Sequence, residues 1–266
     1  MDGVFGFIGT GNMGGALARA VAKRVPGERI LLSNRTAEKS EALAKELGAR
    51  AVDNAAAARE ADFLFLGVKP QGMAALLAEL SPVLNARETP FVLVNMAAGI
   101  SIARLRELAG RDWPVFQIKP NTPCAVGEGM IFFDSAGVPE EAEEALLDAL
   151  SAAGRLSPLP EGQMDIAGVV AGCGPAFADL FLEALADGGV ACGLPRKTAY
   201  EAAAQMLLGA AKLALETGDH PGALKDAVCS PGGTTIQGVR ALEHGGFRSA
   251  VMEAVIAAYE KNRSMG

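Results

Sequence analysis

Three glycines near the start of the chain have the spacing of a turn that binds the phosphates of a dinucleotide. They lie in the segment Gly9-Thr10-Gly11-Asn12-Met13-Gly14, between an apolar run over 4–8 and a helical pattern over 12–25. The first glycine permits the tight bend, the second lets a pyrophosphate approach the backbone, and the third packs the helix on the strand. Free N–H groups at the helix N-terminus then face the phosphates. The segment predicts a dinucleotide site, although glycine turns of this shape also occur without a ligand.

The segment after the second predicted strand distinguishes between the two nicotinamide cofactors. It reads Ser33-Asn34-Arg35-Thr36, and no acidic residue follows before Glu38. NAD-binding chains usually carry Asp or Glu here to accept from the ribose 2′-hydroxyl, and a carboxylate would repel a 2′-phosphate. An arginine with nearby hydroxyls and an amide would bind that phosphate. The segment therefore favours NADPH over NADH, unless Ser33 or Asn34 merely caps the next helix.

Further candidates for cofactor contact follow other strands of the same half. Val68, Lys69 and Pro70 lie at the carboxyl end of the apolar run 62–68, where ligands of such sheets bind. A solvent-exposed role for Lys69 is nearly as plausible as a cofactor contact. Asn54 follows the short strand 49–52, and it either contacts the adenosine or caps the short helix after it.

A second constellation lies near the other end of the chain. The segment Ser230-Pro231-Gly232-Gly233-Thr234-Thr235 is a rigid turn that delivers two threonines to the start of a helix over 235–243. Backbone N–H groups and hydroxyls at a helix N-terminus form a socket for a small anion. The other interpretation is that Thr234 or Thr235 simply caps the helix, but two adjacent glycines exceed what a cap needs.

The remaining residues offer little conventional chemistry. His220 and His244 stand at a predicted helix start and a predicted helix end, outside any cluster with Cys or Asp. The four cysteines are widely spaced without a CxxC pair, which indicates reduced thiols and neither disulfides nor a metal site. An enzyme with this inventory must use chemistry that its cofactor supplies.

The elements that position these residues form two predicted domains. Over 1–160, short apolar runs alternate with helical patterns, and runs such as 63–66 and 91–94 are apolar on both faces, as strands of a covered parallel sheet are. The prediction is an α/β fold: an N-terminal Rossmann-type, doubly wound, mostly parallel sheet. Predicted strands cover 4–8, 29–32, 49–52, 62–68, 91–95, 115–119 and 130–133. Predicted helices cover 12–25, 36–47 and 140–152, with others after Pro70 and Ser101.

Residues 161–266 are predicted to form an all-helical dimerisation domain, with helices over 175–190, 197–216, 221–228, 235–243 and 247–262. The stretch 202–211 is apolar over most of its circumference, and about a hundred residues supply too little surface to cover such a helix. We therefore expect a homodimer through the C-terminal helices, with a higher homo-oligomer left open.

Composition excludes several other partners. The chain has 266 residues, of which 50% are hydrophobic and 21% charged, and its formal net charge is −7 without a basic run. An acidic chain of this kind is a poor nucleic-acid binder. Mean hydropathy is high at +0.23, yet the uncharged stretches 89–103 and 166–178 fall short of the roughly 18–20 residues that cross a bilayer. We expect no membrane association and a cytoplasmic location.

Taken together, these segments resemble the pyrroline-5-carboxylate reductase family over essentially the whole chain. The most specific stretch runs from Leu224-Lys225-Asp226 through Ser230-Pro231-Gly232-Gly233-Thr234-Thr235. The resemblance also covers the glycine turn, residues 33–36 and 68–70, Ala97-Ala98-Gly99-Ile100, Pro120-Asn121-Thr122-Pro123, Gly174-Pro175-Ala176-Phe177, Glu183-Ala184-Leu185-Ala186-Asp187, Gly193-Leu194-Pro195-Arg196 and His220-Pro221-Gly222.

The resemblance implies a substrate and roles for the residues. The substrate is a small cyclic imine with a carboxylate, which NADPH reduces to proline. By similarity, Ser230 and the backbone of Gly233, Thr234 and Thr235 hold the carboxylate, and Thr235 offers its hydroxyl near the ring nitrogen, which makes Ser230 and Thr235 the catalytic candidates. Asn121 and Pro123 either line the nicotinamide side or are structural.

Two segments depart from the family pattern, and two other functions remain open. Ala171-Gly172-Cys173 stands where Ser-Gly-Ser is usual, and Lys119 stands where methionine is common. One alternative function is that of a β-hydroxyacid dehydrogenase, which carries a catalytic lysine and, four residues later, an asparagine in its first long helix after the junction. Residues 175–190 contain neither. The second alternative is a cofactor-binding protein with a weak or inactive site.

Overall fold

The computed structural model describes residues 3–264, which form two compact units. One unit comprises the chain up to Gly172 together with the end of the last helix from Tyr259, and the other comprises Cys173–Ala258. Each unit is described by itself.

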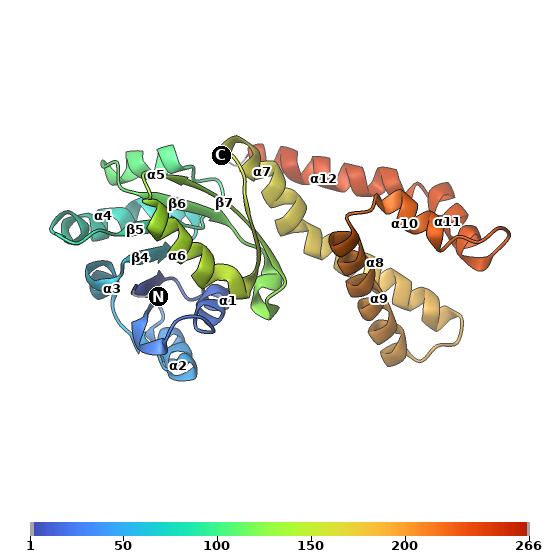
Figure 1. Ribbon diagram of the computed structural model, residues 1–266, viewed down its shortest axis with the longest axis horizontal. Coiled ribbons are helices and arrows are strands. Elements are labelled where there is room, and N and C mark those ends of the chain that lie inside the picture. Colours follow the sequence, from blue (N-terminus) through green and yellow to red (C-terminus); the bar gives the residue numbers. More distant parts are fainter. Residues whose placement is uncertain (1–2, 265–266) are drawn as a thin grey trace. The chain divides into compact units, whose positions relative to one another are not determined.

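The first unit is built on an eight-stranded sheet (Figure 1). The strand order is β3-β2-β1-β4-β5-β6-β7-β8, and only the β6–β7 pairing is antiparallel. The order reverses between β1 and β4, which creates the crevice in which doubly wound sheets bind ligands. The strands are β1 (Phe5–Ile8), β2 (Ile30–Ser33), β3 (Arg50–Ala51), β4 (Phe63–Leu66), β5 (Val92–Asn95), β6 (Val115–Lys119), β7 (Gly129–Ala136) and β8 (Gly154–Pro158).

Helices cover both faces of this sheet because its strands are apolar on both sides. Phe63 and Phe65 of β4 belong to one hydrophobic cluster, and Leu64 and Leu66 belong to the other. The first cluster takes in α1 (Asn12–Val21), α2 (Ala37–Leu47) and α6 (Glu140–Leu150). The second takes in α3 (Asn54–Glu60), α4 (Met73–Asn85) and α5 (Ile102–Ala109). The predicted Rossmann-type arrangement is confirmed.

Two details of the predicted elements are wrong. The helix over 12–25 ends at Val21, because Pro26 disfavours helical backbone at the residue before it and residues 22–25 form tighter turns. The strand β8, which pairs in parallel with β7, was not predicted. Four short 3₁₀ turns complete the unit: η1 (Gly27–Arg29), η2 (Pro70–Gly72), η3 (Thr122–Val126) and η4 (Ser151–Ala153).

A buried arginine ties the loop before β5 to the segment before β4. The guanidinium of Arg87 donates to the carbonyls of Ala58, Ala61 and Pro90, and its side chain is 5% exposed. Burial lowers the pKa of Arg87, and the nearby Asp62 carboxylate, 3.9 Å away, raises it. Losing this side chain would leave buried carbonyls without donors, and such groups are costly.

Replacing Arg87 by methionine is expected to lower the free energy of unfolding by about 2–4 kcal/mol, since several buried acceptors lose their partner at once. Urea unfolding at a fixed protein concentration measures the change. Arg104→Met is the matched control, because Arg104 is half exposed and bonds only on the surface of α5. A decrease in the free energy of unfolding below about 0.5 kcal/mol, the range of ordinary surface changes, would contradict this structural role of Arg87.

The second unit is entirely helical over the described residues. Its helices are α8 (Gly174–Ala191), α9 (Arg196–Thr217), α10 (Pro221–Ala227), α11 (Thr234–His244) and α12 (Phe247–Arg263), which confirms the five predicted helices within one to two residues. Its internal core is small and consists of Ala186, Ala199 and Ala203 between α8 and α9. Large apolar side chains such as Leu180 and Leu208 are more than half exposed.

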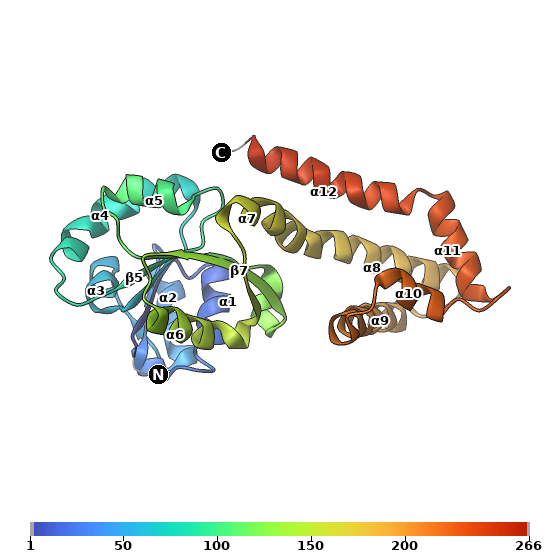
Figure 2. The same ribbon diagram turned by 45° about the horizontal axis from the view of Figure 1, so that its top comes forward.

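One helix is longer than predicted. α7 (Glu161–Gly168) continues through a π-helical segment (Val169–Cys173) into α8, and the three form a helix over Glu161–Ala191 (Figure 2). By length and composition alone this helix could cross a membrane. Only 11% of its apolar 18-residue stretch is buried. The uncharged stretch 166–178 therefore lies within a longer apolar helix than the sequence predicted.

Candidate functional site

The glycine turn lies at the carboxyl end of β1, where the sheet order reverses. Gly9 has φ +99°, and a side chain there would meet the backbone of Gly67 at the end of β4. A side chain on Gly14 would lie 2.0 Å from the Gly9 carbonyl, so both positions require glycine. No protein atom lies within 4 Å of a Cβ built on Gly11, which faces open space on the pocket wall. This is the arrangement that lets a ligand approach the backbone.

Helix α1 begins immediately after this turn with open backbone donors. Gly11 is its N-cap, and no side chain caps it. The first N–H groups of a helix have no intrahelical partner, so those at Asn12 and Met13 remain available for an anion. Thr10 is buried, its N–H donates to Asn34 Oδ1 at 3.2 Å, and its hydroxyl has no partner among the described residues.

The segment after β2 lies at the same edge, because Ile8 pairs with both Ser33 and Leu66 in the parallel ladders. Asn34 Nδ2 donates to the carbonyl of Thr36, and Thr36 is the N-cap of α2 without a side-chain bond. The alternative that Ser33 or Asn34 caps this helix is therefore wrong. Arg35 lines the pocket at this edge, and its side chain has no partner among the described residues.

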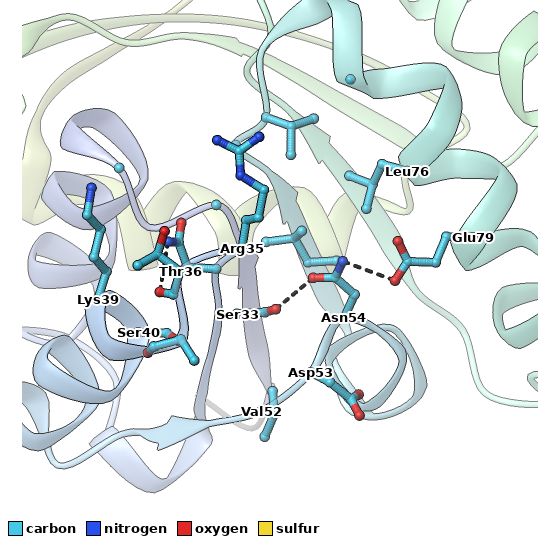
Figure 3. Close-up of a pocket in the computed structure, with 18 of the residues that line it drawn as sticks. Ser33, Arg35, Thr36, Lys39, Ser40, Val52, Asp53, Asn54, Leu76 and Glu79 are labelled. Atoms are coloured by element: carbon cyan, nitrogen blue, oxygen red, sulfur yellow. Dashed lines mark hydrogen bonds between the residues drawn. The ribbon is translucent and has the colours of Figure 1, made fainter.

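Asn54 does not cap its helix either. The N-cap of α3 is Asp53, whose Oδ1 accepts from the Ala56 N–H at 2.7 Å. Asn54 instead accepts from the Ser33 hydroxyl at 2.6 Å and donates to Glu79 Oε1 at 3.1 Å (Figure 3). The capping role predicted for Asn54 is therefore wrong, and the cofactor contact stays a prediction for a side chain that lines the pocket.

These residues surround a pocket of about 1230 Å³ within the first unit. Eight predicted cofactor residues line it: Gly9, Gly11, Ser33, Asn34, Arg35, Asn54, Val68 and Lys69. Seven others do not: Thr10, Asn12, Met13, Gly14, Pro70, Asn121 and Pro123. The pocket walls also contain Lys39, Asp53 and Glu79, which the sequence analysis missed. Lys39 stands in the first turn of α2, so a second basic residue at the start of the helix after Arg35 could have indicated it.

The pocket fits the adenosine half of a nicotinamide dinucleotide. Its wall combines Gly9 and Gly11 of the glycine turn, beside the open N-terminus of α1, with two cations, Arg35 and Lys39. Apolar walls from Val52, Val68 and Leu76 suit a flat ring, and donors beside the β2 end suit a phosphate.

Asn121 and Lys119, at the end of β6, contact the helix that starts at Glu161. These contacts involve the two segments that depart from the family pattern. Asn121 is 8% exposed, donates to the Ala171 carbonyl in the π segment at 3.0 Å, and accepts from the Met130 N–H at 2.9 Å. Lys119 Nζ lies 3.6 Å from Asp165 Oδ1 of α7. Asn121 thus has structural partners, and Lys119 and Ala171 both hold the helix that starts at Glu161.

The predicted anion socket lies in the second unit. Gly233 is the N-cap of α11, no side chain caps this helix, and Gly232 has φ +71°. The interpretation that Thr234 or Thr235 caps the helix is therefore wrong. The Gly233 N–H donates to the Ser230 carbonyl at 3.0 Å, and Ser230 Oγ lies over Gly233. The N–H groups of Thr234 and Thr235 remain open in the first turn.

Other reactive groups are structural. His220 caps α10, its Nδ1 accepting from the Gly222 N–H at 3.0 Å, and His244 ends α11, as predicted. Burial raises the pKa of the Cys124 thiol, which keeps it protonated. Over the described residues the four cysteines are free, and no cluster of His, Cys, Asp and Glu could hold a metal.

Comparisons with known proteins agree with this organisation. Residues 161–265 match a family model described as pyrroline-5-carboxylate reductase dimerisation, and residues 4–99 match one described as NADP oxidoreductase, coenzyme F420-dependent. The pyrroline-5-carboxylate reductase of Escherichia coli is 39% identical over 100% of this chain and 99% of its own length. That of Methanosarcina acetivorans is 40% identical over 98% and 97%.

Solved structures show the same relationship. A crystal structure of Plasmodium falciparum pyrroline carboxylate reductase with NADP bound superimposes with a TM-score of 0.88 and 31% identity, covering 100% of this chain and 98% of that one. The Coxiella burnetii pyrroline-5-carboxylate reductase gives a TM-score of 0.90 with 29% identity, covering 100% and 99%. With identities near 40% along its whole length, this chain belongs to the pyrroline-5-carboxylate reductase family.

Proposed function

We propose that this protein reduces 1-pyrroline-5-carboxylate to L-proline with NADPH, the final step of proline biosynthesis. The observation that carries the proposal is full-length family membership combined with the uncapped α11 N-terminus behind the Ser230–Thr235 turn. The β-hydroxyacid dehydrogenase alternative loses its support, since α8 contains neither of the residues that chemistry needs.

The substrate carboxylate is assigned to the Ser230–Thr235 turn. The N–H groups of Thr234 and Thr235 and the hydroxyl of Ser230 are the donors, and the missing side chain of Gly233 leaves room for that hydroxyl to lie over the turn. The hydroxyl of Thr235 is assigned to the ring nitrogen. This arrangement orients the imine, and orientation is the main contribution a protein makes to such a step.

The cofactor is assigned to the glycine turn and the pocket beside it. The N–H groups of Asn12 and Met13 would hold the pyrophosphate. Arg35, Lys69 and the other residues that line the pocket would hold the adenosine half of the cofactor. When bound, NADPH supplies the hydride that the imine carbon accepts. A protonated imine is a good electrophile, so the chain needs no strong general base, which agrees with two histidines that stand at helix termini.

NADPH absorbance followed with pyrroline-5-carboxylate, with 3-hydroxyacids and without substrate tests the proposed activity. With pyrroline-5-carboxylate the absorbance of NADPH should fall at a rate proportional to enzyme, whereas 3-hydroxyacids with NADP+ and the substrate-free control should give no turnover. Turnover of the hydroxyacids alone would overturn the proposal in favour of the dehydrogenase. No turnover with any of these substrates would favour a cofactor-binding protein with an inactive site.

We propose further that residues 161–266 form the interface of a homodimer. The helix over Glu161–Ala191 and α9 expose Leu180, Leu208 and Leu213 by half or more in the single chain. A second copy that covers these side chains explains their exposure without a membrane. The free cysteines fit a reducing compartment, and we assign the protein to the cytoplasm.

Leu208→Asp is expected to convert the dimer into monomers or aggregates, because a carboxylate buried in an apolar interface lacks a partner. Size-exclusion chromatography with light scattering at micromolar concentration measures the mass against the 27.3 kDa chain. Glu216→Gln, on the charged surface of the same helix, should keep the wild-type mass. A wild type that elutes as a stable monomer would contradict the interface.

A further inference from the structure

The adenosine pocket carries opposite charges on its two sides. Figure 3 shows Lys39 and Glu79 at opposite sides of the pocket, with Arg35 between them in the view. The side chains of Arg35 and Lys39 have no partner among the described residues, so both cations are free for a phosphate. Glu79 would repel a phosphate and attract N–H donors. The two sides therefore suit different parts of one ligand.

A chain of hydrogen bonds fixes the acidic side. The Ser33 hydroxyl donates to Asn54 Oδ1 at 2.6 Å, and Asn54 Nδ2 donates to Glu79 Oε1 at 3.1 Å (Figure 3). A carboxylate accepts only, so the amide must turn its NH₂ group toward Glu79. Within the described part of the chain, one N–H of Asn54 and the second oxygen of Glu79 remain unused. Together they present a donor beside an acceptor on neighbouring side chains.

The walls next to this polar pair are apolar. Val52, Val68, Ala75 and Leu76 line the pocket, and they come from the segments after β3 and β4 and from α4. Apolar side chains with a few convergent polar groups are the usual surroundings of a ring-shaped ligand. The edge of adenine presents an amino donor at C6 beside an acceptor at N1, which is complementary to the unused groups of Glu79 and Asn54.

We propose that Glu79 and Asn54 form a subsite that selects the adenine base of the cofactor. Glu79 accepts from the C6 amino group, and Asn54 Nδ2 donates to N1. The inference rests on the proposed function only in taking an adenine dinucleotide as the cofactor. It assigns to Glu79 a specificity that the glycine turn and Arg35 do not supply, because those contact phosphates.

The hypoxanthine analogue of NADP+ tests this subsite. It carries a carbonyl at C6 and a hydrogen on N1, so both proposed bonds are reversed. Calorimetry without imine substrate should give the wild type a Kd for NADP+ about tenfold or more below that for the analogue, since polar groups left unpaired reject a ligand strongly. Glu79→Gln can donate to the carbonyl, and it should bring the two Kd values within about twofold of each other, a difference below about 0.4 kcal/mol.

Glu88→Gln is the matched control, because Glu88 is exposed, lies in the loop after α4 and does not line the pocket. It should keep the wild-type ratio. Equal Kd values in the wild type would overturn the subsite. An unchanged ratio in Glu79→Gln, including one in which both ligands bind equally more weakly, would also overturn it, since Glu79 would then only orient Asn54. Wild-type turnover of pyrroline-5-carboxylate, measured separately, decides the proposed function whichever ratio is found.

Discussion

Replacing Thr235 by alanine is expected to lower kcat/KM for pyrroline-5-carboxylate about a hundredfold, because a donor aimed at the reacting group is worth roughly 2.7–4 kcal/mol. Thr235 lies in the first turn of α11, where its hydroxyl does not cap the helix. Its removal should therefore affect the substrate and leave the helix intact. Steady-state rates at saturating NADPH measure the change.

Thr235→Ser is the control for this prediction, since it keeps the hydroxyl and removes only a methyl group. It should retain activity within about threefold, a cost below 1 kcal/mol. If Thr235→Ala itself loses less than threefold, Thr235 is an ordinary residue of the first turn. The Ser230–Thr235 turn would then hold the carboxylate through its backbone alone.

Replacing Arg35 by alanine is expected to raise the Kd of NADPH about ten- to a hundredfold, the worth of one or two charge-assisted hydrogen bonds. NADH lacks the 2′-phosphate, so its Kd should change little. Calorimetry with each cofactor separates the two effects without relying on turnover. Arg35 lines the pocket after β2, and its side chain has no partner to lose within residues 3–264.

Arg104→Ala serves as the control for overall charge, because Arg104 lies on the exposed surface of α5 and does not line the pocket. It should leave both Kd values unchanged. Equal weakening of NADPH and NADH by Arg35→Ala would contradict the phosphate assignment. Arg35 would then contact a part that both cofactors share.

The fold of the first unit follows from sequence patterns where strands are buried on both faces. Runs such as Phe63–Leu66 divide their side chains between two clusters, and this division requires helices on both sides. The strand β8 escaped prediction because Gly154 and Pro158 bound it and its side chains are only partly buried. An edge strand of that kind has no apolar pattern to recognise.

The long helix over Glu161–Ala191 could not be predicted for a different reason. Gly168, Gly172, Gly174 and Pro175 indicate a break, yet the helix continues through a π segment. Asn121 stabilises that segment by donating to the Ala171 carbonyl across fifty positions of sequence. A tertiary contact of this kind leaves no local signal.

The candidate site was predictable where chemistry requires a local motif. The glycine turn and the segment after β2 meet because their strands pair in register. Glu79 reaches the pocket from the second turn of α4, and only the folded arrangement brings it to Asn54. Asp53, rather than Asn54, caps α3, and two adjacent capping residues cannot be ranked from sequence.

A crystal structure with NADP+ and proline would locate both ligands at once. We expect the carboxylate of proline on the N–H groups of Thr234 and Thr235, within hydrogen-bond distance of the Ser230 hydroxyl, and the pyrophosphate at the N-terminus of α1. A carboxylate anchored by any other segment, or a pyrophosphate away from the glycine turn, would contradict this expectation.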